Sequence, residues 1–189
     1  MLAYLLESAA AIPASRTALT PFTNDSGFHT RPDFVALGTR IRTVEEAEAW
    51  IARIRALPDY FGQHRAWLQL GLDRGVTQPR EILPGVADQI EAQIVAPEES
   101  TLFTPLAGLP PSMAPAEQAR LRAEALEAIE TRALPALREL HAFFVDVYIP
   151  GARESLGARA LPGGAAYYRD LVRYHTTLET TPEAIHERG

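Results

Sequence analysis

Aromatic, hydroxyl and imidazole side chains gather near the end of this chain, and these residue types suit substrate binding. On the helix expected from 165 to about 175, Tyr168 and His175 lie on one face, and Thr176 follows directly. Phenol and imidazole groups placed together near a helix end can bind a carbonyl, stabilise an oxyanion or orient a substrate. We therefore predict Tyr168, His175 and Thr176 as substrate-binding residues. The alternative is that these side chains fill a helix–helix contact, with their polar tips hydrogen-bonded.

The five histidines do not form a recognisable metal-binding motif. Zinc hydrolases commonly carry HExxH on one helix, and the nearest approach is His186-Glu187, two residues before Gly189. Glu183 and His186 have the i, i+3 spacing of di-iron bundles, but those sites need the motif twice, and only one copy is present. His64 and His141 fall within apolar stripes, where a core histidine is expected. We predict no catalytic residue, no metal ligand and no cofactor within this chain.

Other catalytic signatures are missing from the sequence. It contains no G-x-S-x-G elbow, no P-loop and no G-x-G-x-x-G, so serine hydrolase and nucleotide-binding functions have no support. Counting alone does not exclude a Ser-His-Asp triad, whose members need not be close in sequence. The absence of Cys excludes disulfides and thiol catalysis, and it leaves the cellular compartment undecided.

Charge and hydropathy limit the partners. The net charge is −6, and the 18 basic residues are all Arg, dispersed among acids, so no basic stripe predicts nucleic-acid binding. No apolar run approaches the roughly 18 residues that a membrane span requires. The opening residues 1–15 resemble a signal peptide, but they lack a basic start and Glu7 interrupts the apolar run. We expect a soluble protein, either cytoplasmic or periplasmic.

Helical periodicity dominates, and no strand pattern exceeds a few residues. Thr43 and Glu46 have the spacing of a capping box, and helices are also expected after Pro58, near Pro79 and from about Pro115. The apolar face of the helix after Pro58 should hold Phe61, His64, Trp67, Leu68 and Leu72. The predicted fold class is all-α: an irregular assembly of about seven to eight helices with long Pro-rich connections.

Two segments are expected to be long irregular connections, 13–40 and 96–115. Between 135 and 149 apolar residues cover most of the helix circumference, and Pro135 either kinks that helix or starts a new one. A helix that is apolar nearly all round is buried in something large. We therefore interpret residues 1–189 as a single helical region that is part of a larger helical domain.

The last residues support the same interpretation. Thr181, Pro182 and Glu183 supply a hydroxyl cap, a first-turn proline and a first-turn acid, which together open a helix. About seven residues follow, too few for a helix that is stable without packing partners. We expect the chain to be the N-terminal part of a longer protein.

Several motifs resemble one bacterial family, the domain of unknown function 885. The tail carries Leu161-Pro162-Gly163-Gly164, Tyr167-Tyr168, Arg173-Tyr174-His175-Thr176-Thr177 and Thr181-Pro182-Glu183-Ala184-Ile185-His186. The earlier matching segments, in the same order, are Gly27-Phe28-His29, Thr43-Val44-Glu45-Glu46-Ala47, Arg55-Ala56-Leu57-Pro58 and Gly71-Leu72-Asp73-Arg74-Gly75-Val76. The resemblance spans nearly the whole chain, and the tail is its most specific part.

The resemblance implies a parent protein roughly three times this length, mostly helical and related to zinc metallopeptidases. Family members carry a His-Glu motif with further His downstream of this tail, so no zinc ligand transfers to a residue of this chain. The first hypothesis is therefore an N-terminal helical wall of a metallopeptidase cleft, inactive alone, with peptide as substrate and the rest of the parent as partner. The alternatives are a non-enzymatic helical scaffold or protein-interaction module, and a small-ligand binder that uses the Tyr/His face.

Overall fold

The computed structural model describes residues 19–178 and 180–188, and this part of the chain is all-α, as predicted. The opening segment 1–15, with its resemblance to a signal peptide, lies outside the described residues. The helices are α3 (Arg31–Gly38), α4 (Val44–Arg55), α5 (Leu57–Asp73), α6 (Leu83–Glu91), α7 (Thr104–Ala107), α8 (Pro115–Ala128), α9 (Leu134–Phe143), α10 (Ile149–Gly151), α11 (Gly164–Thr176) and α12 (Pro182–His186). The described residues contain no strand, and their one isolated bridge pairs Phe22 with Gly27.

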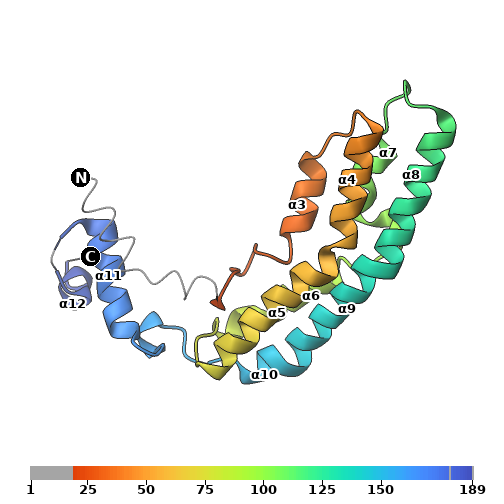
Figure 1. Cartoon of the computed structure of the whole chain (residues 1–189). Coiled ribbons are helices and arrows are strands. Elements are labelled where there is room, and N and C mark those ends of the chain that lie inside the picture. Colours follow the sequence, from red (N-terminus) through yellow and green to blue (C-terminus); the bar gives the residue numbers. More distant parts are fainter. Residues whose placement is uncertain (1–18, 179, 189) are drawn as a thin grey trace.

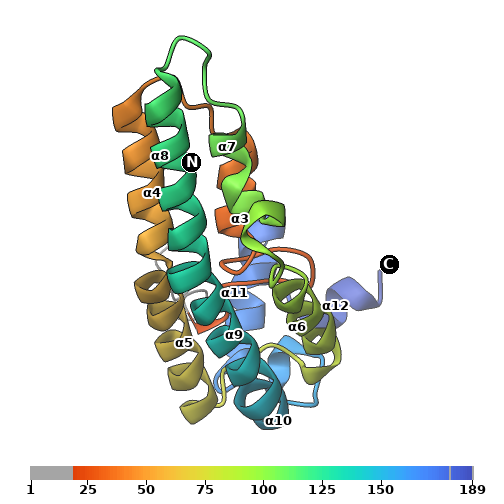
Figure 2. The same cartoon turned by 90° about the vertical axis from the view of Figure 1, so that its right-hand side faces the viewer.

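Two long helical rods run side by side in the same direction (Figure 1). The first consists of α4 and α5, and the second runs from α8 through α9 to α10, with α4 packed on α8 and α5 on α9. Because the rods are parallel, the chain must return between them, and α6 and α7 lie on this return. Figure 2 shows that α3, α6 and α7 form a second layer against the rods.

The start of α4 confirms the capping box. The Thr43 hydroxyl accepts a hydrogen bond from the Glu46 amide at 3.2 Å, which satisfies a donor that the helix itself leaves free. The Glu46 carboxylate in turn accepts from the Arg42 amide at 2.7 Å, one residue earlier than in the standard box. Two backbone donors at the helix start are therefore paired by side chains, and local sequence alone fixes where α4 begins.

The second rod passes through Pro135 without ending, because it widens just before the proline. Residues Ile129–Ala133 are π-helical, and the Leu134 amide donates to the carbonyl of Ile129, five residues back. A proline within a helix lacks a donor and pushes its ring against the carbonyl four residues earlier, and the wider turn relieves that contact. The same arrangement precedes Pro150, where Phe144–Tyr148 are π-helical.

Three expectations from the sequence are corrected by the structure. Residues 31–38, expected within an irregular connection over 13–40, form α3, because Pro32 starts a helix that is too short to show a clear period. The segment 96–115 also holds the short helix α7. Trp67, expected on the buried face of α5, is 47% exposed.

Among residues 19–178 and 180–188, the apolar helix at 135–149 is covered on only part of its circumference. Leu140, Phe144 and Tyr148 are buried, and the rings of Phe144 and Tyr148 both contact the ring of Phe22, whereas Val145 and Val147 remain more than 40% exposed. The π-helical turn shifts the register of the side chains, so two apolar faces result instead of one.

One arginine fastens the end of the second rod to the rest. The Arg80 guanidinium donates to the carbonyls of Ile149, Pro150 and Ala152 at 3.2, 2.9 and 3.0 Å, which pairs acceptors that the helix end leaves free. Beyond this point α11 and α12 are set apart from the rods (Figure 1), and an ion pair of 2.6 Å between Arg159 and Glu183 ties α12 to the turn before α11.

Leu68 allows the contact between the rods to be tested. It is fully buried on α5, so Leu68→Ala should lower the free energy of unfolding by about 2–5 kcal/mol, the usual range for a buried leucine. Urea unfolding followed by circular dichroism measures this change. Gln63→Ala on the exposed side of α5 is the matched control and should change stability by less than about 0.5 kcal/mol. Equal effects of the two substitutions would contradict the packing described here.

Candidate functional site

Two grooves flank α3 and share Arg31 and Tyr60. The α3–α4 groove has a volume of about 320 Å³ and is lined by Arg31, Pro32, Val35, Trp50, Arg53, Ile54, Ala56, Leu57, Tyr60 and Leu102. The loop groove has a volume of about 510 Å³ and is lined by Pro21, Ser26, Gly27, Phe28, Thr30, Arg31, Phe34, Tyr60 and His64. Their linings bring together aromatic and cationic side chains, among them Phe28, Arg31, Trp50, Arg53 and Tyr60.

The floor of the α3–α4 groove is apolar and held by one buried hydrogen bond. The Trp50 indole donates to the carbonyl of Leu102 at 3.0 Å, which joins α4 to the turn before α7. Ile54 and Leu57 complete the buried floor. Because the only polar atom of the indole is already paired, the groove presents a purely hydrophobic base to an occupant.

The rim of the same groove is cationic. Arg31 and Arg53 both line it, and none of its lining residues is acidic. The Arg31 guanidinium lies 5.8 Å from the centre of the Phe34 ring, a cation–π contact at the surface. Within the described part of the chain neither Arg31 nor Arg53 has an ion pair, so both charges are available to an anionic group.

Tyr60 separates the two grooves. Its hydroxyl donates to the carbonyl of Phe28 at 3.2 Å, which fixes the loop 20–30 against α5. Burial raises the pKa of the Tyr60 phenol, and the nearby charge of Arg31 offsets part of that effect. The phenol therefore stays neutral at ordinary pH and acts as a hydrogen-bonding and packing group.

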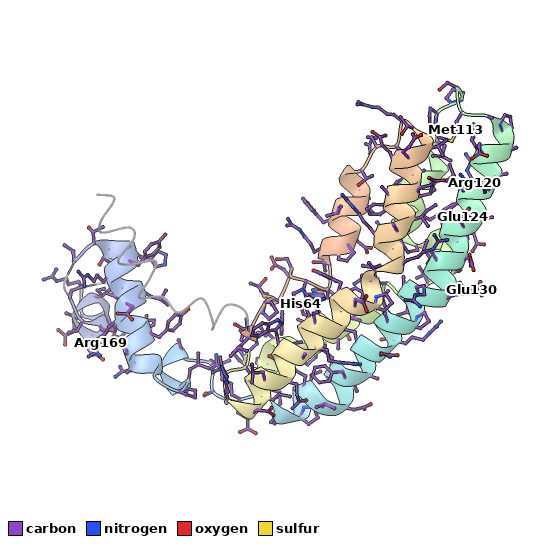
Figure 3. All side chains as sticks on the ribbon, viewed as in Figure 1. His64, Met113, Arg120, Glu124, Glu130 and Arg169 are labelled. Atoms are coloured by element: carbon purple, nitrogen blue, oxygen red, sulfur yellow. The ribbon has the colours of Figure 1, made fainter. Side chains whose placement is uncertain are left out.

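His64, labelled in Figure 3, is one of the residues that line the loop groove. Its ring stacks on Phe28 with centroids 4.4 Å apart, and the Tyr60 ring meets it edge-on at 4.7 Å. Burial lowers the pKa of His64, and its Nδ1 atom has no hydrogen-bond partner among the described residues. His64 is thus a half-buried neutral imidazole beside open space.

His29 is fully buried beneath the loop groove. The Gln89 amide nitrogen donates to the carbonyl of Asn24 at 3.0 Å, so its oxygen is the atom that accepts from His29 Nε2 at 2.9 Å. This places the proton of the neutral ring on Nε2 and leaves Nδ1 unprotonated and without a hydrogen-bond partner in the part of the chain that the structure describes. Burial lowers the pKa of His29, and the bond to Gln89 opposes only part of that shift.

The three residues predicted from sequence lie elsewhere, on α11. Tyr168 is 39% exposed and His175 is exposed, with the His175 ring edge-on to Tyr174 at 5.0 Å. The Thr176 hydroxyl is already engaged, since it donates to Val172 and accepts from the Leu178 amide. None of the three lines the grooves beside α3, and their substrate-binding role stays a prediction.

The donor groups of the described residues do not fit a zinc ion. Glu183 is held by Arg159 at 2.6 Å and His186 is exposed, so the pair offers two ligand residues at most. Residues 19–178 and 180–188 contain no cluster of three or more His, Cys, Asp or Glu side chains that could hold a metal. A zinc site needs at least three protein ligands.

The residues around α3 were missed by the sequence analysis. Arg31-Pro32 marks a helix start, but the helix spans only eight residues and gives no periodic signal. The segment Gly27-Phe28-His29 carries a family resemblance but no recognisable binding motif. Contacts such as Trp50 to Leu102 join residues 52 positions apart, and no local pattern reveals them.

The fold and these grooves define an all-α protein with a groove-bearing layer over two helical rods. The family described as bacterial proteins of unknown function, DUF885, matches residues 1–189, and the chain belongs to this family. None of the curated proteins compared with the chain matches it.

A solved structure shares this fold. It is described as a "putative lipoprotein from Colwellia psychrerythraea", superposes with a TM-score of 0.70 over 78% of this chain, and is 17% identical in sequence. The chain spans 26% of the length of that protein. Among the helices of the described residues, none is long and apolar enough to cross a membrane.

The lowered pKa values of His29 and His64 predict a loss of stability at mildly acidic pH. Their folded pKa lies below the unfolded value of about 6.5, so the unfolded state binds more protons as the pH falls through this window. The free energy of unfolding should therefore decrease from about pH 7.5 to about pH 5.5, measured by urea unfolding. His29→Gln should lower stability at neutral pH yet flatten this dependence. An unchanged pH dependence in His29→Gln would contradict the assignment.

Proposed function

We propose that the chain forms one wall of a peptide-binding cleft in a longer zinc-dependent metallopeptidase, a hydrolase. In this proposal the zinc ligands and the catalytic Glu come from residues outside these 189, so the chain alone is inactive. The observation that carries the proposal is the α3–α4 groove, in which an apolar floor meets two arginines without acidic partners. The resemblance to a family related to zinc metallopeptidases supplies the reaction class.

A wall of this kind would act by binding and orienting the substrate. Peptides present apolar side chains and charged or carbonyl groups at fixed intervals, and the two grooves offer a hydrophobic base next to cationic and phenolic groups. Holding a substrate in one orientation lowers the entropic part of the barrier for a reaction at a neighbouring centre. The wall needs no reactive group of its own to do this.

Tyr168, His175 and Thr176 are proposed as further substrate contacts on α11. The phenol and imidazole of the first two are exposed and can donate hydrogen bonds to a peptide carbonyl. Thr176 would contribute mainly by ending α11, because its hydroxyl already bonds the helix backbone. The rest of the parent chain would be the partner that closes the cleft.

The proposal predicts that this chain and the longer protein differ in zinc binding and in peptide hydrolysis. The 189-residue chain should bind less than one equivalent of zinc and hydrolyse no peptide, whereas the longer protein should hydrolyse peptides and lose activity to a chelator. In the longer protein, Arg31→Gln should raise KM about tenfold with unchanged zinc content, because a contact to bound substrate is lost.

Zinc analysis and a fluorogenic peptide assay measure these outcomes. Arg42→Gln is the control, because Arg42 lines neither groove. Stoichiometric zinc or turnover in the 189-residue chain would overturn the proposal, and so would a longer protein with neither zinc nor peptidase activity.

A second proposal is a non-enzymatic interaction module, and one observation favours it. On α3, Phe34 and Leu37 are 70% and 59% exposed, a pair of large apolar side chains on one helix. Adjacent exposed apolar residues often mark a protein–protein contact.

This second proposal predicts a stable oligomer that depends on α3. Phe34→Ser should shift the assembly toward the monomer by light scattering, whereas Leu156→Ser, at an equally exposed leucine outside α3, should not. A chain that stays monomeric at all accessible concentrations would exclude self-association as the role of α3.

A further inference from the structure

We propose that the α3–α4 groove binds the C-terminal residue of a peptide, with an apolar side chain on the floor and the terminal carboxylate on Arg31. The inference rests on the proposed peptide-binding function and specifies which part of the substrate this wall recognises. It assigns a specificity-determining role to Arg31, with Arg53 as a second cation at the same rim.

The shape and lining of the groove favour a side chain as occupant. Its volume of about 320 Å³ lies at the small end of the range of about 300–1,000 Å³ found for ligand pockets. Trp50, Ile54, Leu57 and Leu102 supply a buried apolar base, so a leucine or phenylalanine side chain would lose water there at little polar cost.

The charges favour an occupant that carries an anion. The chain as a whole has a net charge of −6, yet the groove has two arginines and no acid in its lining. Other arginines are paired with glutamates, for example Arg55 with Glu124 at 3.5 Å and Arg65 with Glu139 at 3.4 Å. The planar guanidinium of Arg31 can take a carboxylate in a two-pronged hydrogen bond.

The acid nearest in sequence does not neutralise this charge. Asp33 is the one acidic residue of α3, and it lines neither groove. Asp33 is half-buried, and burial raises the pKa of its carboxyl, an effect that the nearby Thr101 hydroxyl offsets only in part. The charge pattern at the rim is therefore complementary to a carboxylate that arrives with the ligand.

The groove contains its own reporter. The chain has two tryptophans, Trp50 in the groove floor and Trp67 at an exposed position on α5. In a Trp67→Phe background the fluorescence comes from Trp50 alone. Titration of this variant of the 189-residue chain with N-acetyl-Ala-Ala-Leu as free acid, and with the same peptide as C-terminal amide, measures the contribution of the carboxylate.

The expected result is saturable binding of the free acid and at least tenfold weaker binding of the amide. Loss of a charge-assisted hydrogen bond changes affinity by about tenfold or more. Arg31→Gln should weaken binding of the free-acid peptide about tenfold, so that the free acid and the amide bind with equal affinity. Arg42→Gln, a surface arginine outside the groove, is the matched control and should leave both affinities unchanged.

Several outcomes would overturn the assignment. The first is equal affinity for the free-acid peptide and its amide. The second is an Arg31→Gln variant that still binds the free acid more tightly than the amide. The third is tighter binding of decanoate than of the free-acid peptide, which would indicate a lipid site. Because the titration needs no zinc, its result is independent of the peptidase assay. If the free-acid peptide binds more tightly than the amide but the longer protein hydrolyses no peptide, the peptidase proposal is rejected and the carboxylate site stands. If the longer protein hydrolyses peptides but the free acid and the amide bind equally, the carboxylate site is rejected and the peptidase proposal stands.

Discussion

The apolar seam between the two helical rods is the contact on which the rest of the structure depends. Ile51 and Ile54 of the first rod and Leu121, Ile129 and Leu140 of the second are fully or almost fully buried. Because the rods are parallel, the chain must travel back along their length between them, and this return places α6 and α7 in a second layer. The layer that carries the grooves is therefore a consequence of how the rods pair.

The grooves exist because α3 packs on this layer at a distance from α4. Trp50 forms part of the floor of the α3–α4 groove and is held there by its hydrogen bond to Leu102. Tyr60 lies between the two grooves and is held by its hydrogen bond to Phe28. These two hydrogen bonds use up the polar atoms that would otherwise face the groove, which leaves the arginines as the charged groups at its edge. The proposed recognition of a peptide by this face would combine hydrophobic burial with one class of charge.

The elements with strong local signals were predictable from the sequence. The cap at Thr43, the proline at position 58 and the period behind them define α4 and α5 without help from distant residues. Two predictions from the sequence were wrong, for different reasons. Trp67 fits the apolar period of α5, yet the described residues leave it 47% exposed. The helix α3 spans eight residues, which is too short for periodicity to detect.

The sequence by itself determined the all-α class, the main helix boundaries and the family, because caps, prolines and motifs act over a few residues. Only the tertiary structure decided which polar groups meet. Arg31, Tyr60, His64 and His29 are spread over 35 positions, and they gather around α3 because the parallel rods bring the loop 20–30 against α5. Side chains from separate helices become neighbours through packing, and the periodicity within each helix does not predict which helices pack together.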